Sequence, residues 1–149
     1  MDVSMLIFKK DIINAAISKF PDTDFSDLFE NYLYQWIPCD LCEDSGIPKD
    51  ELCRYLFDTE ARKVREFFIK HLGREPKDSE AILVDEITFK EFLCWIEREM
   101  KSITLYDVAI SNDIEASVSN SMDIVYAFNS IQNTSIDFNS EVIIYRESW

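Results

Sequence analysis

The sequence has few of the residues that most enzymes use to hold phosphates or to move protons. It contains two glycines, Gly46 and Gly73, so it lacks both the P-loop and the glycine-rich dinucleotide fingerprint. It contains one histidine, which excludes a histidine-rich metal site and leaves the commonest general base scarce. Basic residues are also few, with 15 Lys and Arg against 29 Asp and Glu.

The resulting formal charge of −14 bears on the choice of partner. Direct binding to nucleic acid depends on Lys and Arg displacing counterions from the phosphates, so it is disfavoured here. Binding to an anionic membrane surface is disfavoured for the same reason. Fast, salt-sensitive association with a basic protein is favoured. Solubility alone is the alternative explanation for the charge.

The negative charge is concentrated in two blocks of the sequence. Residues 20–60 carry a net charge of −9 and residues 102–149 a net charge of −6, whereas residues 61–101 are neutral. If the two blocks share a face, the protein presents a focused negative field.

The N-terminus lacks the basic region and the cleavage site of a signal peptide, and no apolar run approaches the roughly 20 residues that span a bilayer. The four cysteines, in a chain without an export signal, are expected to be thiols. We therefore expect a cytoplasmic protein.

The composition, 47% hydrophobic and 13% aromatic, is sufficient for a packed core, so we expect one domain over residues 1–149. The clearest predicted helix spans residues 24–37, where large apolar residues recur at helical spacing. They are Phe25, Leu28, Phe29, Tyr32, Leu33, Trp36 and Ile37. Asp22, Thr23 and Asp24 are candidate N-caps, and Pro38 ends the helix.

A second strong prediction is a helix from Thr88 to about residue 102. Thr88 and Glu91 match a capping box, and the flanking Ile87 and Phe92 match a hydrophobic staple. Gly73 suits the position just after a helix C-terminus. The other predicted helices cover residues 5–20, 48–57, 59–72 and 113–128.

The composition changes after about residue 103, where Asn, Ser and β-branched residues become frequent and basic residues nearly vanish. Residues 136–138 and 142–145 are predicted to form a β-hairpin around Asn139 and Ser140. The predicted fold is therefore mostly α within the α+β class, with about five or six helices and a small C-terminal hairpin. A subdivision into residues 1–103 and 104–149 is an alternative, although the second part is small for a core of its own.

Two sites of possible chemistry have simpler interpretations. Cys39 and Cys42 have the spacing of one zinc knuckle, with Cys53, His71 or Cys94 as distal ligands, but a second close pair is missing. Incidental thiols are the better interpretation. His71 is predicted at a helix C-terminus, where a cation is favourable, and the sequence identifies no nucleophile to go with it.

Residues 40–51 resemble a degenerate EF-hand calcium loop. Asp40, Asp44 and Glu51 match its first, fifth and twelfth positions, but Cys42 stands at a ligand position and Gly46 comes one residue late. Residues 87–93 resemble the exit half of a second such loop, with Ile82 and Val84 where ligands belong. The resemblance implies a calcium-free regulatory protein that clamps an amphipathic partner helix.

The preferred hypothesis is a non-enzymatic acidic inhibitor that binds and blocks a basic protein without a cofactor or a metal. Toxin immunity proteins and phage inhibitors of CRISPR or restriction enzymes fit this class, because their carboxylates fill sites that evolved to hold phosphates. The partner would be a nuclease toxin or another nucleic-acid-processing enzyme. The candidate partner-binding residues are Asp22, Asp24, Asp27, Tyr34, Asp40, Glu43, Asp44, Asp50 and Glu51.

Overall fold

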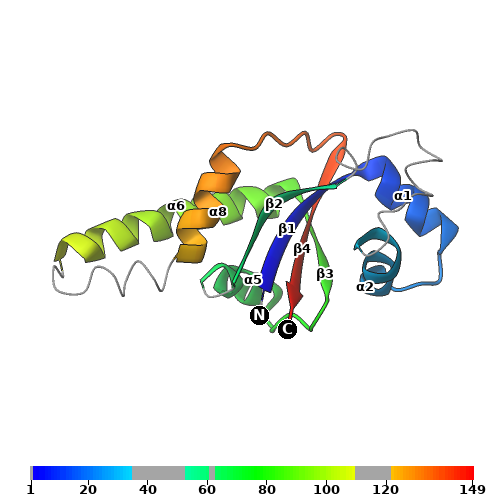
Figure 1. The fold of residues 1–149 in the computed structure, drawn as a ribbon, viewed down its shortest axis with the longest axis horizontal. Coiled ribbons are helices and arrows are strands. Elements are labelled where there is room, and N and C mark those ends of the chain that lie inside the picture. Colours follow the sequence, from blue (N-terminus) through cyan, green and yellow to red (C-terminus); the bar gives the residue numbers. More distant parts are fainter. Residues whose placement is uncertain (1, 35–52, 61–62, 110–121) are drawn as a thin grey trace.

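A four-stranded antiparallel sheet organises the fold (Figure 1). The computed structural model describes residues 2–34, 53–60, 63–109 and 122–149. The strands are β1 (Asp2–Lys9), β2 (Cys53–Glu60), β3 (Ala81–Val84) and β4 (Glu141–Ser148). Their order in the sheet is β2-β1-β4-β3, so the first and last strands are its two central strands.

Helices lie on both faces of this sheet in the described parts of the chain (Figure 1). They are α1 (Lys10–Lys19), α2 (Phe25–Leu28), the π-helix η1 (Phe29–Tyr34), α5 (Val64–Leu72), α6 (Glu86–Ala109) and α8 (Met122–Gln132). The first three cover one face, and α5, α6 and α8 cover the other. The C-terminal part of α6 projects beyond the sheet in Figure 1.

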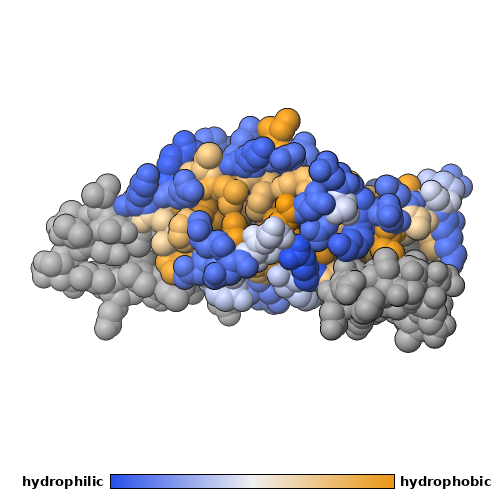
Figure 2. All heavy atoms as spheres, turned by 90° about the horizontal axis from the view of Figure 1, so that it is seen from above, coloured by the Kyte–Doolittle hydropathy of each residue, from blue (hydrophilic) through white to orange (hydrophobic). Residues whose placement is uncertain are grey.

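The larger core lies between the sheet and helices α5, α6 and α8. It is rich in aromatic rings: Phe68 stacks on Tyr145 with ring centroids 3.6 Å apart, and Phe92 packs against Phe57 and Phe68. Hydrophobic side chains are visible at the surface in the middle of the face drawn in Figure 2. Phe128, Ile136 and Phe138 are only partly buried against this core.

The smaller core lies on the opposite face, where α1, α2 and η1 pack. Leu6 and Phe8 of β1 and Ile144 of β4 are fully buried there, together with Leu28 and Phe29. Because neighbouring residues of β1 and β4 point to opposite faces, these two strands supply side chains to both cores. Six consecutive residues of β1 are buried as a result.

The predicted fold, mostly α with a small C-terminal hairpin, is wrong, because a four-stranded antiparallel sheet draws strands from the beginning, middle and end of the chain. The predicted helix over residues 5–20 is strand β1 followed by α1. A strand buried on both faces has no alternation of apolar and polar residues, so its apolar run resembles a buried helix. Residues 53–57, predicted as helix, belong to β2, and β3 was not predicted.

The predicted C-terminal hairpin is also wrong. Residues 142–145 do form a strand, but β4 pairs with β1 and β3 and not with residues 136–138. The Asp137 side chain accepts hydrogen bonds from the Asn139 N–H and the Ser140 hydroxyl, both at 3.0 Å. This turn, in which those bonds hold the pKa of Asp137 below its ordinary value, directs the chain into β4.

Several helical predictions are confirmed in part. Residues 25–34 are helical with Leu28, Phe29 and Leu33 buried, while residues 35–37 lie outside the described residues. Helix α5 begins at Val64 and not at Thr59, because residues 53–60 form β2. Gly73 follows α5 at φ 69°, as predicted. Helix α8 covers residues 122–132, against the predicted 113–128, of which 113–121 lie outside the described residues.

The N-cap of α6 is Asp85 and not the predicted Thr88. Asp85 is the capping residue, since its Oδ1 accepts a hydrogen bond from the Thr88 N–H at 2.7 Å, and these bonds with Thr88 lower the pKa of Asp85. The helix therefore begins at Glu86, and Thr88 lies inside it. Ile87 is 71% exposed and forms no staple, whereas Phe92 and Ile96 are buried as predicted.

Two further observations concern the alternative division near residue 103 and membrane-spanning helices. Helix α6 continues through residue 103, and β4 lies between β1 and β3. Among the helices that the structure describes, none combines the length and the apolar character needed to cross a bilayer.

The burial of α6 leads to a stability prediction. Phe92→Ala should lower the free energy of unfolding by about 3–5 kcal/mol, because it leaves a cavity among Phe57, Phe67 and Phe68. Ile87→Ala on the same helix should change it by less than about 0.5 kcal/mol. Urea unfolding of the two variants measures both values, and equal losses would contradict the placement of α6.

Candidate functional site

The predicted carboxylates that the structure describes lie in a short connection between α1 and η1. Phe20 is the C-cap of α1, and its N–H donates to the Ala16 carbonyl. The Thr23 N–H then donates to the Phe20 carbonyl at 3.2 Å. Asp24 caps α2, because its side chain accepts a hydrogen bond from the Ser26 N–H at 3.0 Å. These bonds fix the backbone that carries Asp22, Asp24 and Asp27.

Aromatic packing holds this segment against the sheet. The Phe25 and Phe29 ring centroids are 6.4 Å apart, and Phe29 meets Phe8 of β1 edge-on at 5.6 Å. On the same turn, the Ser26 hydroxyl oxygen accepts a hydrogen bond from the Ala81 N–H of β3 at 3.1 Å. The apolar residues therefore face inward, and the segment is tied to the sheet edge.

Asp22, Asp24 and Asp27 are consequently exposed. They lie within six residues of one another, and in residues 20–34 no lysine or arginine is present to neutralise them. Among the described residues, none of the three takes part in an ion pair. The structure thus brings together three of the predicted site residues. We call Asp22, Asp24 and Asp27 the acidic surface.

The other predicted site residues cannot be placed on this surface. Tyr34 is the last residue of η1, and its side chain is not among those described. The remaining five lie outside the described residues; they are Asp40, Glu43, Asp44, Asp50 and Glu51.

Four of the described arginines pair with glutamates of their own chain and not with the acidic surface. Glu30, the fourth acid of this segment, accepts two hydrogen bonds from Arg146 of β4, at 2.9 and 3.0 Å. The Arg146 side chain is only 6% exposed. Glu30 is therefore part of the packing between η1 and the sheet, which distinguishes it from its exposed neighbours.

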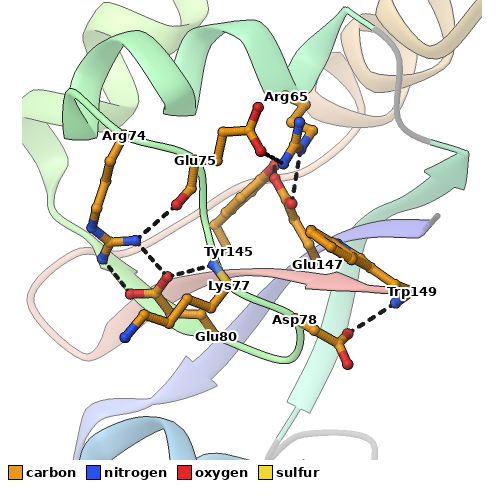
Figure 3. A network of polar contacts seen from close by, with 9 residues as sticks. All are labelled: Arg65, Arg74, Glu75, Lys77, Asp78, Glu80, Tyr145, Glu147 and Trp149. Carbon is orange, nitrogen blue, oxygen red and sulfur yellow. Dashed lines mark hydrogen bonds and ion pairs between the residues drawn. The ribbon is translucent and has the colours of Figure 1, made fainter.

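Arg65 and Glu147 form the most deeply buried of the described ion pairs (Figure 3). The Arg65 Nε donates to Glu147 Oε2 at 2.9 Å, and the Glu147 side chain is fully buried. The Tyr145 hydroxyl donates to the other carboxylate oxygen at 2.6 Å, and its burial together with this bond raises the pKa of Tyr145. Glu147 is thereby satisfied on both oxygens without solvent.

Arg74 and Glu80 form a second pair beside this network (Figure 3). Both carboxylate oxygens of Glu80 accept from the Arg74 guanidinium, at 2.5 and 2.8 Å, and the Lys77 N–H donates to the same side chain. The bonds from Arg74 are the main reason that the pKa of Glu80 falls to about 2, against an ordinary value of 4.5.

Arg54 of β2 completes the set by pairing with Glu141 at the start of β4. Both glutamate oxygens accept from Arg54, at 2.9 and 3.0 Å, and the Asp137 N–H also donates to Glu141. Burial by itself raises the pKa of Glu141, but these hydrogen bonds outweigh it, so the net shift is downward.

The pairs between distant residues were not predicted from the sequence. Arg146 is the lone basic residue of residues 102–149, and it directly follows the apolar run from Val142 to Tyr145. A single charge in such a strand is a signal for a buried partner, because an unpaired buried charge is costly. The identity of that partner, Glu30, depends on the fold and leaves no mark in the local sequence.

The other candidate sites have structural explanations where the structure describes them. His71 lies in the last turn of α5, as predicted, with its ring parallel to Phe67 at 6.0 Å. Cys94 is exposed on α6, while Cys39 and Cys42 lie outside the described residues. Within the described ranges, no three His, Cys, Asp or Glu side chains are grouped so that they could hold a metal ion.

The structure does not support the resemblance to calcium loops in residues 82–93, which it describes. Ile82 and Val84, at its ligand positions, belong to strand β3, and Val84 is buried in the larger core. Residues 87–93 are the first turns of α6, and β3 precedes them in a sheet. Residues 40–51 lie outside the described residues.

Comparison with known proteins does not add to this geometry, since no family model, curated protein or solved structure matched the chain.

The buried Arg65–Glu147 pair generates a prediction about stability. Arg65→Met should lower the free energy of unfolding by about 3 kcal/mol, because it leaves the Glu147 carboxylate buried without a counter-ion. Adding Glu147→Gln to that variant should restore part of the loss, since the amide carries no charge and still accepts from Tyr145. Urea unfolding of both variants tests this; further destabilisation by the second change would contradict it.

The Arg74–Glu80 pair generates a prediction about pH. The folded-state pKa of Glu80 lies below its unfolded value, so its ionisation stabilises the fold above about pH 4.5. This contribution is lost as the pH falls from 4.5 to about 2. The difference in urea midpoint between the wild type and Glu80→Gln should therefore shrink over that range. Arg74→Met should flatten the same dependence, and an unchanged difference down to pH 2 would oppose it.

Proposed function

We propose that this protein is a non-enzymatic acidic binding protein that associates with a basic protein partner through the acidic surface. The observation that carries the proposal is the division of charge. The described ion pairs of Arg54, Arg65, Arg74 and Arg146 engage glutamates of the same chain. Asp22, Asp24 and Asp27 are exposed, and within the described residues they form no ion pair. A surface patch of one charge sign attracts a partner of the opposite charge and speeds its association.

The partner class follows from the chemistry of the surface. Closely spaced carboxylates on a rigid turn resemble the phosphates that a nucleic-acid-binding cleft is built to hold, because both offer anionic oxygens to Lys and Arg. We propose a basic nuclease toxin or another nucleic-acid-processing enzyme as the partner. The roles that fit are those of a toxin immunity protein or of a phage inhibitor of CRISPR or restriction enzymes, acting in the cytoplasm.

The segment that carries the acidic surface is suited to this role because it is held in place before binding. The bonds of Asp24 to Ser26 and of Ser26 to Ala81, with the packing of Phe25 and Phe29, fix its backbone. A preorganised surface loses less conformational entropy on association than a flexible one. Asp22, Asp24 and Asp27 therefore bind a cationic cleft with little loss of conformational entropy.

The test compares two sets of variants on the partner obtained by affinity capture from the source cell. Asp22→Asn, Asp24→Asn and Asp27→Asn combined should slow association with that partner by about tenfold at low salt and change dissociation less. Asn still caps α2, so the fold is retained. The matched control replaces Glu91 and Glu97, exposed on α6, by Gln and should leave the rate close to that of the wild type.

Two results would count against the proposal. One is an association rate that is the same in the Asn variant and in the wild type. The other is a rate that does not change between low and high salt, because steering between exposed charges is screened beyond roughly 10 Å at 0.1 M salt.

A further inference from the structure

Strand β3 is an edge of the sheet, and it adjoins the acidic surface. It pairs with β4 on one side, and the sheet order places no other strand of the described chain on its opposite side. One apolar residue of this edge, Leu83, is 49% exposed, and Ile87 in the first turn of α6 is 71% exposed. The link to the acidic surface is the hydrogen bond from the Ala81 N–H to Ser26, which lies between Asp24 and Asp27.

The same hydrogen bond shows which backbone groups of β3 point outward. The Ala81 N–H donates to a side chain on α2, so it faces away from β4. In an antiparallel ladder, alternate residues direct their N–H and C=O to the same side. The N–H and C=O of Leu83 therefore also face outward, and within the described residues no hydrogen bond engages them.

Carboxylates flank this edge at both ends. Asp24 and Asp27 are next to Ser26 at the Ala81 end, and Asp85 and Glu86 follow Val84 at the other. The distance between the ends is roughly 13 Å for four residues of extended chain. Glu86 is partly offset by Lys90, at 3.1 Å. An extended segment placed along Leu83 would therefore pass between two acidic ends.

We infer that the β3 edge receives an extended, lysine- or arginine-bearing segment of the partner as an added strand, an inference that rests on the proposed function. The outward N–H and C=O of Leu83 supply the backbone hydrogen bonds, and the exposed Leu83 side chain supplies an apolar contact. The flanking carboxylates select basic side chains. Ser26 occupies the Ala81 N–H, so α2 limits how far the added strand extends.

The experiment uses a short fluorescein-labelled peptide that alternates lysine with valine, and measures its binding to the full chain by anisotropy at low salt. We expect binding by the wild type and weaker binding, by roughly fivefold, when a backbone N–H that bonds to β3 is methylated in the peptide. An otherwise identical glutamate–valine peptide should bind much more weakly. Failure of the lysine–valine peptide to bind, or equal binding of its methylated form, overturns the inference.

Two variants test the same edge from the protein side. Leu83→Pro removes an outward N–H that β4 does not use, so it should weaken peptide binding about fivefold more than Leu83→Ala, which keeps the N–H. Circular dichroism and thermal unfolding check that each variant folds. The methylated peptide decides the question on the wild type if the proline variant does not fold.

The remaining outcomes separate this inference from the proposed function. If Asp24→Asn with Asp27→Asn weakens peptide binding while Leu83→Pro does not, the acidic surface stands and strand addition is wrong. Equal binding of the lysine and glutamate peptides overturns the selection by charge. Dimerisation of the free protein in sedimentation, with protection of the Leu83 N–H from exchange, would show that the occupant is a second copy and would also overturn it.

Discussion

The pairing of β1 with β4 is the interaction on which the rest of the molecule depends. Their register runs from Asp2 opposite Ser148 to Lys9 opposite Glu141, and the two strands bury side chains on both faces of the sheet. Each core is therefore built on the same pair of strands. Both buried clusters contain side chains of β1 and β4, so a change in the register of this pair would disturb both cores.

This arrangement also determines where charge is found on the molecule. Strand β4 carries both Arg146 and Glu147, which point to opposite faces, and each recruits a partner from the helical layer on its own side. Arg146 forms an ion pair with Glu30 of η1, and Glu147 forms one with Arg65 of α5. The charges that hold the layers to the sheet are thus of both signs and buried, while those at the α1–α2 connection are of one sign and exposed.

The sequence predicted the parts of the fold that depend on local spacing. The apolar stripe of residues 25–34, the buried face of α6 and the role of Gly73 each arise within a few residues, and each is confirmed for the side chains that the structure describes. The sheet could not be predicted, because β1 pairs with strands more than forty residues away and its run of buried residues has no strand-like alternation. In the candidate site, the exposure of Asp22, Asp24 and Asp27 follows from their positions off the apolar stripe. The ion pair between Glu30 and Arg146, which separates Glu30 from the acidic surface, depends on tertiary contact and could not be predicted.

The central position of the first and last strands has a consequence for synthesis of the chain. Strand β1 is synthesised before the other three strands, yet one of its two neighbours, β4, is made only after about 130 further residues. Neither core can close until then, because each needs both strands. Until that point β1 lacks one of its two native neighbours, so closure of both cores waits for the synthesis of β4, and the growing chain is a natural client for chaperones that hold extended hydrophobic segments.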